Sequence, residues 1–309
     1  FVIDKVKFKQ KLITEVKNEK QDLVFNPIDD VLFKTPLDFI LTELKLNHFE
    51  MTQATTVHVV KNIDVKANFF ESQLNLKHLA LSYNDIQLSS KASIDLIANN
   101  PLDLNLNINQ IKNQHIKHSL NLNVKGDLAN LNVGLKTQGQ FPSSTEGTLN
   151  LKKQNYPFNI KTDIAHWQHS HNDKTFKLNH LNLAATGSLK AYEIKLDSQQ
   201  GINAYPLIDL NLLAKGNLTQ FTLDKLLLNT SKSSVALKGD VKFKDNLMAN
   251  ISGELSKLNL QDFSANINTD LNGAFELNFN QAKEDWLLSI NNFDLGGTFS
   301  LDEDNSVPF

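Results

Sequence analysis

Residues 102–109 have the sequence Leu-Asp-Leu-Asn-Leu-Asn-Ile-Asn. Successive side chains of an extended chain point to opposite faces, so this stretch places four aliphatic residues on one face and four polar residues on the other. A period of two residues is typical of a β-strand with one face away from water. We therefore predict a strand here whose two faces meet different environments.

The same alternation recurs along most of the chain. Further strands are predicted around residues 57–59, 74–76, 120–124, 181–183, 194–196, 210–212, 235–237 and 275–279. Only the charged stretch from Lys9 to Lys20 has the spacing of a short amphipathic helix, and Pro27 and Pro36 follow it. We predict an irregular or short helical lead-in over residues 1–35 and a continuous repetitive β-groove segment over residues 36–309.

Glycine is used in one recurrent local context. Nine of the 12 glycines are followed two positions later by an apolar residue. These nine are Gly126, Gly139, Gly147, Gly187, Gly216, Gly239, Gly253, Gly273 and Gly297. Glycine in such a place supplies a positive φ at a hairpin, or a bulge within a strand. The recurrence indicates a hairpin unit that is repeated with variable spacing.

The number of strands predicts the form of the sheet. About one strand per 12 residues gives roughly twenty strands between residues 36 and 301. Open twisted sheets rarely exceed about ten strands without curling or splitting. We therefore predict an all-β fold: an elongated, curled antiparallel sheet of repeated hairpins, in which the apolar face is concave and forms a groove.

Composition excludes several classes of function. The chain has 309 residues, of which 40% are hydrophobic and 21% charged, and it is too apolar for a disordered protein. All 31 basic residues are lysines, which argues against nucleic-acid binding because base and phosphate recognition relies heavily on arginine. The absence of cysteine excludes disulfides and thiolate chemistry. No run of eighteen apolar residues occurs, so we expect no membrane-spanning helix within this chain.

Motifs for catalysis are missing from the sequence. It contains no GxSxG elbow, no phosphate-binding P-loop and no GxGxxG fingerprint. Asp29–Asp30 is expected to lie in a turn, and the acidic run at residues 302–304 has the character of a solvated end of the chain. We expect that the protein is not an enzyme and that it has no cofactor.

Histidines gather in two places. Residues 166, 169, 171 and 180 are histidines, and His115 and His118 form a second pair. Metal ligands converge from rigid elements, whereas His169 and His171 lie in a stretch rich in Ser, Asn and Asp that is typical of a loop. We interpret these histidines as solvated side chains and expect no metal site.

What remains is apolar surface, for which two interpretations stay open. A single strand such as residues 102–108 would fit an ordinary β-sandwich. Aromatic residues make up only 8% of the chain, and every repeat carries the same one-sided alternation without an obvious second sheet to cover it. A trough that closes on lipid is therefore a comparably economical way to shelter the apolar face.

Several segments resemble the TamB proteins, which are AsmA-like components of the translocation and assembly module. One is Leu120-Asn-Leu-Asn-Val-Lys-Gly-Asp-Leu128, and another is Leu181-Asn-Leu-Ala-Ala-Thr-Gly-Ser-Leu-Lys-Ala-Tyr192. Similar stretches span residues 35–47, 79–104, 208–218, 255–260 and 286–299. The order and spacing of the whole series carry the resemblance, and residues 1–34 depart from it most.

The resemblance implies a place and a role. It implies a periplasmic β-taco groove in a parent protein anchored in the inner membrane, with the anchor outside this chain. It also implies movement of phospholipid between the inner and outer membranes in support of outer-membrane biogenesis. A TamA-like outer-membrane partner would be contacted by other parts of the parent protein. The alternative is a chaperone-like scaffold that acts with TamA to assemble autotransporters or outer-membrane β-barrels.

Under this interpretation the apolar positions of the clearest strands would contact phospholipid acyl chains. These predicted lining residues are Leu102, Leu104, Leu106, Ile108, Leu120, Leu122, Val124, Leu181, Leu183, Leu210, Leu212, Phe275, Leu277 and Phe279.

Overall fold

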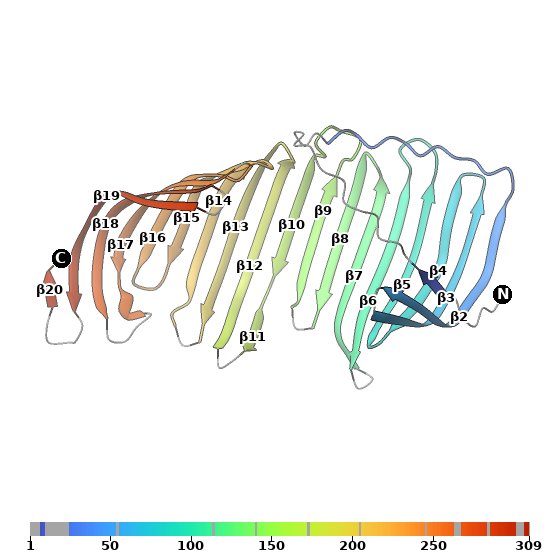
Figure 1. Ribbon diagram of the computed structural model, residues 1–309, viewed down its shortest axis with the longest axis horizontal. Coiled ribbons are helices and arrows are strands. Elements are labelled where there is room, and N and C mark those ends of the chain that lie inside the picture. The colour runs from blue at the N-terminus through green and yellow to red at the C-terminus, as the bar shows by residue number, and fades with distance from the viewer. Residues whose placement is uncertain are drawn as a thin grey trace. The chain divides into compact units, whose positions relative to one another are not determined.

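The computed structural model of the chain consists almost entirely of β-strands (Figure 1). It describes residues 7–9, 25–53, 56–112, 115–139, 141–171, 174–203, 205–244, 246–262, 267–282, 285–300 and 306–308. One short 3-10 helix, η1 (Leu260–Asp262), is the sole helix among these residues. The chain divides into two compact units, Phe1–Pro157 and Phe158–Phe309, which are described separately.

Unit 1 is an antiparallel meander in which each strand pairs with the next along the chain. Its strands are β2 (Phe39–Gln53), β3 (Thr56–Phe70), β4 (Gln73–Tyr83), β5 (Ile86–Asp95), β6 (Leu102–Lys112), β7 (His115–Asp127), β8 (Asn130–Gln138) and β9 (Ser143–Leu149). The short β1 (Lys7–Lys9) pairs with β2 in parallel.

Unit 2 repeats this architecture. Its strands are β10 (Phe158–Ile164), β11 (Trp167–His171), β12 (Lys174–Ser188), β13 (Ala191–Ile202), β14 (Ile208–Gly216), β15 (Gln220–Asn229), β16 (Ser234–Lys242), β17 (Leu247–Leu258), β18 (Asn268–Ala282), β19 (Asp285–Ser300) and β20 (Ser306–Pro308). Strands β10 and β11 both pair with β12, one after the other along its length. From β12 to β20 each strand pairs with the next, always antiparallel.

Register shifts interrupt half of these ladders. The register shifts between Leu41 and Leu44 in β2, between Leu76 and Leu79 in β4, and between Leu255 and Leu258 in β17, among other places. An extra residue on one strand bends it and increases the local twist, so repeated bulges curl a sheet. The prediction of an all-β, curled, antiparallel sheet built from repeated hairpins is confirmed.

Neither unit has a conventional hydrophobic core. Among the described residues, the buried hydrophobic side chains are Leu131 in unit 1 and Ile164, Leu178, Ala214 and Leu223 in unit 2. The positions on either side of a strand nevertheless differ, because apolar residues of β14 are half-buried or buried while Asp209, Asn211 and Lys215 are exposed. The apolar face of the sheet is thus the more sheltered one, although no second sheet covers it in the part of the chain that the structure describes.

An irregular segment, residues 25–35, which we call the strap, runs along one end of the unit 1 strands (Figure 1). It bonds to successive turns: Thr35 N donates to Glu71 O (2.8 Å), Phe33 N to Leu96 O (3.1 Å) and Ile28 N to Leu151 O (2.9 Å). The turns also bond to one another, through Leu96 N to Ser72 O, Leu128 N to Asn99 O and Leu151 N to Leu128 O. The strap therefore connects the ends of β3 to β9 across the direction of the strands.

Two side chains fix the middle of the strap. Asn100 is almost completely buried; its Oδ1 accepts from Val31 N and its Nδ2 donates to Val31 O, both at 2.8 Å. Asp30 accepts from Asn99 N at 2.9 Å and pairs with Lys152 Nζ at 3.0 Å. The Asp30 carboxylate thus connects two loops that are far apart in the sequence.

Two further predictions concern local structure. His169 and His171 lie in strand β11 and not in a loop, since residues 167–171 pair in register with residues 174–178 of β12. The helix proposed over Lys9–Lys20 falls, beyond the end of β1 at Lys9, on residues outside the described part of the chain.

Candidate functional site: the apolar faces

The strand register of unit 1 brings the predicted lining residues onto one face. Leu104 lies opposite Val124, Leu106 opposite Leu122, and Ile108 opposite Leu120. The same rows continue into both neighbouring strands. Seven predicted residues share this face: Leu102, Leu104, Leu106, Ile108, Leu120, Leu122 and Val124. All seven are half-buried, so their outer surfaces remain open to a ligand.

Unit 2 has an equivalent face. A row of leucines crosses five strands, from Leu183 through Leu196, Leu212 and Leu226 to Leu237. The other predicted residues, Leu181, Leu210, Phe275, Leu277 and Phe279, lie on the same face as this row and are also half-buried. Their placement on one face agrees with the alternation, while their role as lipid contacts stays a prediction.

The faces include apolar residues that the prediction left out. Examples in unit 1 are Leu88 opposite Ile108 and Leu135 opposite Leu122. In unit 2, Leu226 and Ile251 continue the rows of Leu212 and Leu277. Leu226 follows a register shift in β15, whereas Leu135 belongs to the unbroken alternation of Leu131, Val133 and Leu135 in β8, which period two alone could have identified.

Glycines make room on the apolar faces. Gly253 of β17 lies between Leu237 and Phe275, and a Cβ there would come within 2.6 Å of Phe275 Cε1 and 2.8 Å of Leu237 Cδ2. The Phe275 ring thus occupies the space above the glycine. Five of the nine recurrent glycines have positive φ, as predicted; Gly126, at φ 127°, also has the Asn130 carbonyl where a Cβ would lie.

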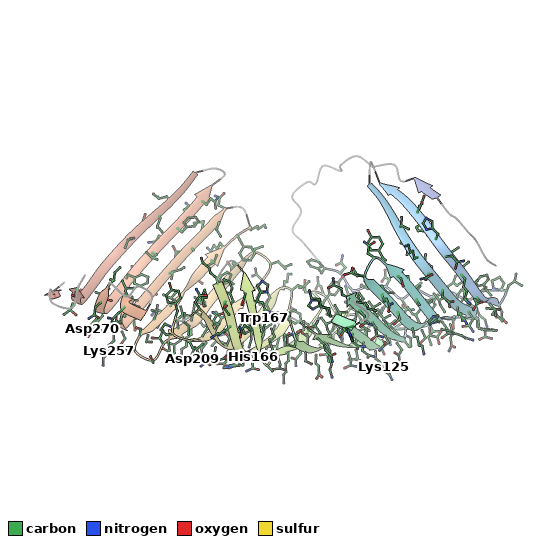
Figure 2. The ribbon with its side chains drawn as sticks, turned by 90° about the horizontal axis from the view of Figure 1, so that it is seen from below. Lys125, His166, Trp167, Asp209, Lys257 and Asp270 are labelled. Carbon is green, nitrogen blue, oxygen red and sulfur yellow. The ribbon has the colours of Figure 1, made fainter. Side chains whose placement is uncertain are left out.

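The opposite faces of both sheets are polar. In unit 1, Asn107 Nδ2 donates to Asn105 Oδ1 at 2.8 Å, and Asn121 donates to Asn107 across the strands. Lys125 of unit 1 and Asp209 of unit 2 belong to these polar faces and are labelled in Figure 2. Each sheet therefore keeps one hydrated face and one apolar face.

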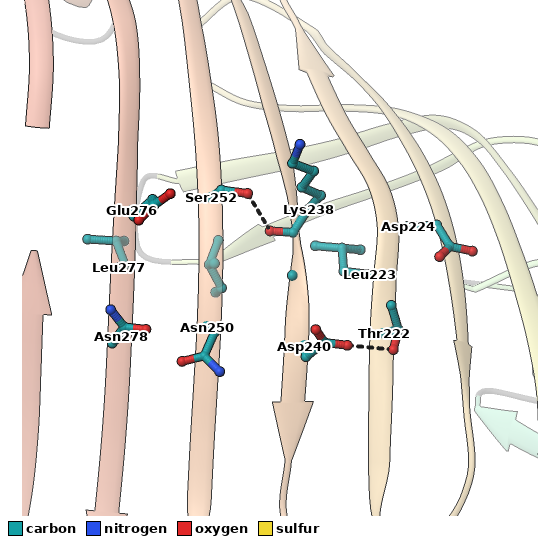
Figure 3. Close-up of a pocket in the computed structure, with 12 residues that line it drawn as sticks. Thr222, Leu223, Asp224, Lys238, Asp240, Asn250, Ser252, Glu276, Leu277 and Asn278 are labelled. Carbon is teal, nitrogen blue, oxygen red and sulfur yellow. Dashed lines mark hydrogen bonds between the residues drawn. The ribbon is translucent and has the colours of Figure 1, made fainter. Parts of the chain in front are cut away.

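A hollow with a volume of about 480 Å³ lies on the polar face of unit 2 (Figure 3). Its polar side chains bond within the wall: Thr222 Oγ1 donates to Asp240 Oδ1 at 2.6 Å, and Ser252 Oγ donates to Lys238 O at 3.5 Å. Nearby, the hydrogen bond and charge of Asp224, 2.9 Å away, raise the pKa of Lys215. Charges of both signs are paired across this exposed surface, an arrangement typical of a hydrated face.

The histidines do not converge on one another. His180 Nε2 lies 2.9 Å from Asp197 Oδ1, while the ring of His169 stacks on Trp167 with centroids 5.9 Å apart. Over the described residues, no group of three or more His, Cys, Asp or Glu side chains is arranged to hold a metal ion. Nor does this part of the chain contain a helix long and apolar enough to cross a membrane.

With a one-sided curled sheet established, comparison with known proteins becomes informative. The family model described as TamB, N-terminal domain, matches residues 4–302. The chain belongs to the TamB family. The translocation and assembly module subunit TamB of Haemophilus influenzae (strain ATCC 51907 / DSM 11121 / KW20 / Rd) is 25% identical over 251 residues.

That alignment covers 78% of this chain and 19% of the relative, so the chain matches about a fifth of the length of that TamB protein. No solved structure matches the chain. The TamB family assignment agrees with the resemblance drawn from the order of the strands. What a full-length TamB subunit does is therefore carried over to this chain only as a proposal.

Proposed function

We propose that the apolar faces of this TamB-family chain bind the acyl chains of phospholipids. The chain would form a groove segment of a periplasmic bridge between the inner and outer membranes. A TamA-like outer-membrane protein would be engaged by other parts of the parent protein, and the inner-membrane anchor would lie outside this chain. The observation that carries the proposal is the row of half-buried aliphatic residues in each unit, which no second sheet covers among the described residues.

Burial supplies the binding energy in this proposal. Each CH₂ group removed from water contributes about 0.8 kcal/mol, so an acyl chain gains several kcal/mol without any charged clamp. Leucine rows without hydrogen-bond donors or acceptors suit a ligand that has none. A wall of this kind holds and conducts a lipid but performs no bond-making chemistry, and we propose that the chain is not an enzyme.

The test is retention of lipid by the purified chain. Native mass spectrometry after detergent-free purification should show bound phospholipid. The double variant Leu104→Asp/Leu122→Asp places two charges diagonally on the apolar face. We expect the amount of bound phospholipid to fall at least about tenfold, because an uncompensated carboxylate in contact with hydrocarbon costs several kcal/mol.

The control uses the same two strands. Asn105→Asp/Asn121→Asp places the same charges on the same diagonal of the polar face, and lipid retention should be unchanged. Far-UV circular dichroism confirms that both variants keep their β-structure. Equal loss in the two variants, or no phospholipid on the unaltered chain, would contradict the proposal.

A second candidate function is a scaffold for β-strands of client polypeptides. Strand β19 has 16 residues, and its edge away from β18 is paired, among the described residues, only where β20 meets Thr298–Ser300. Leu287 and Ile290 of β19 are 64% and 57% exposed. An apolar edge of this length can accept an added strand. Capture of peptide without lipid in the same mass spectra would favour this candidate.

A further inference from the structure

The apolar face of unit 1 becomes more polar along its strands, from the ends beside the strap toward the opposite ends. The row beside the strap is apolar across seven strands, interrupted only by a glycine. It runs through Phe39, Phe69, Leu74, Ile94, Leu102, Gly126, Leu131 and Leu149. A polar group placed against this row would lose water and find no side-chain partner there, which costs several kcal/mol.

Toward the opposite ends of the strands, polar side chains enter the same face. In β8 and β9 the row of Ile108 and Leu120 continues as Thr137 and Ser143, whose hydroxyl oxygens lie 2.8 Å apart. One row further, Gln110 lies opposite His118. The Gln110 amide donates to Asp85 in the adjacent turn at 2.6 Å. We call these ends, at the β4–β5, β6–β7 and β8–β9 turns, the polar rim.

The strap makes the other end still more apolar. The Phe33 ring stacks on Phe69, with centroids 5.6 Å apart and planes at 18°. Val31 and Leu32 are 57% and 69% exposed, and the hydrogen bonds of the strap backbone are directed at the turns. The strap thus adds apolar side chains beyond the strand ends, beside its ion pairs Asp30–Lys152 and Lys34–Glu71.

The dimensions of the face suit one lipid leaflet. Ser143 and Leu149 lie at opposite ends of β9 on the same face, and six residues of strand span roughly 20 Å. The hydrocarbon of one leaflet is about 15 Å thick, half of a bilayer core of about 30 Å. An acyl chain laid along the strands would therefore reach from the strap to the central rows, with the polar head beyond it.

From this gradient we infer that unit 1 binds phospholipid in one orientation. The acyl chains point toward the strap, and the head group lies at the polar rim, beside Thr137, Ser143, Gln110 and His118. The inference rests on the proposed lipid binding and adds a direction to it. Thr137 and Ser143 are positioning residues: their hydroxyl groups bond to each other and to Phe141 O, and their oxygens can still accept hydrogen bonds from an ammonium head group where the aliphatic rows end.

The orientation can be mapped with two photoactivatable probes. The chain is loaded from vesicles of phosphatidylethanolamine and phosphatidylglycerol that contain phosphatidylethanolamine with a diazirine either on the head group or at the end of an acyl chain. Cross-linked peptides are then identified by mass spectrometry. We expect the head-group probe to label residues 137–143 and the acyl probe to label the row of Leu131 and Leu149.

The outcomes separate the two proposals. If the acyl probe labels the apolar face but the head-group probe labels the strap side, or both ends equally, the orientation is wrong and lipid binding stands. If neither probe labels the apolar face, lipid binding itself fails and the orientation falls with it.

A matched pair of variants in β9 gives a second measure. Leu149→Asn introduces an amide beside the strap, and we expect lipid retention to fall about three- to tenfold, since each 1.4 kcal/mol changes an equilibrium tenfold. Thr148→Asn introduces the same amide next to Leu149 but on the polar face of β9, and it should leave retention unchanged. A loss with Thr148→Asn as large as that with Leu149→Asn, at equal melting temperatures, would contradict the contact of acyl chains beside the strap.

Discussion

At the scale of single residues, the two faces of the sheet place different demands on side chains. A leucine on the apolar face meets neighbours in its own sheet and no opposing layer, so small differences in its shape are tolerated. A glycine beneath an aromatic ring has no such freedom. Gly253 lies beneath Phe275 and beside Leu237, and its neighbours occupy the space that any side chain would need.

Replacing Gly253 with valine should therefore destabilise the protein. The new side chain displaces Phe275, and overpacking of this kind costs about 1–3 kcal/mol. Thermal unfolding followed by circular dichroism at 218 nm (in the β-sheet band) would show a lower melting temperature. Adding Phe275→Leu to Gly253→Val should restore part of the loss by removing the ring.

Gly134 provides the control for this prediction. It lies on the polar face of β8, its φ is not positive, and a Cβ there would come no closer than 4.0 Å to Asn123 O. Gly134→Val should leave the melting temperature unchanged or raise it slightly, because the unfolded chain loses conformational freedom. Similar destabilisation by both substitutions would show that the Phe275 contact is not the cause.

At the scale of elements, the strap joins turns that the strands alone would leave separate. The ion pair between Asp30 and Lys152 makes the stability of this connection dependent on pH. The hydrogen bond and charge of Lys152, together with the hydrogen bond from Asn99, lower the pKa of Asp30 from its ordinary value of 3.8. A carboxyl group whose pKa is lower in the folded state than in the unfolded state stabilises the folded state at pH values above its unfolded pKa. This stabilisation is lost as the pH falls through the pKa of the folded state.

We therefore expect Asp30→Asn to lower the melting temperature at neutral pH and to have a shrinking effect below about pH 3.8. The measurement is the difference in melting temperature between the unaltered chain and the variant from pH 7 to pH 3. Asp103→Asn is the control, since Asp103 and Lys125 form an exposed pair at 3.7 Å that contributes little. A constant difference across this range would exclude the ion pair as the source of stabilisation.

How much of these elements the sequence could predict depends on where their partners lie. The strand of residues 102–109 was predictable because its alternation is local and unbroken. The strap was not, because residues 25–35 have no period and bond mainly to backbone atoms of turns up to 130 residues away. Strand β11 was also missed, since its Gln, His and Ser residues favour a loop and pairing with β12 overrides that preference.

At the scale of the whole molecule, the apolar face was predictable but its polarity gradient was not. The fourteen predicted lining residues fall on the apolar faces because period two fixes the face. The gradient toward Thr137 and Ser143 depends on which strand ends lie side by side, and bulges shift that register by amounts that a local pattern does not contain.

Pairing between neighbouring strands also limits how far a local defect spreads. Because each unit is a meander with few buried side chains, its stability is close to a sum over adjacent strand pairs. We expect Gly253→Val to speed amide hydrogen exchange in β16, β17 and β18 while exchange in β4 to β8 stays unchanged. Uniformly faster exchange throughout the chain would instead indicate one cooperative folding unit.

The strap has a consequence for the response of unit 1 to mechanical force. A force directed across the strands of a meander loads one ladder of hydrogen bonds at a time, so the strands separate one after another. The strap adds an irregular tether that runs across the strands and is bonded to three turns, at Glu71, Leu96 and Leu151. Tension across the strands of unit 1 would then be shared between the ladders and this tether, and the strapped ends of the strands would open after the polar rim.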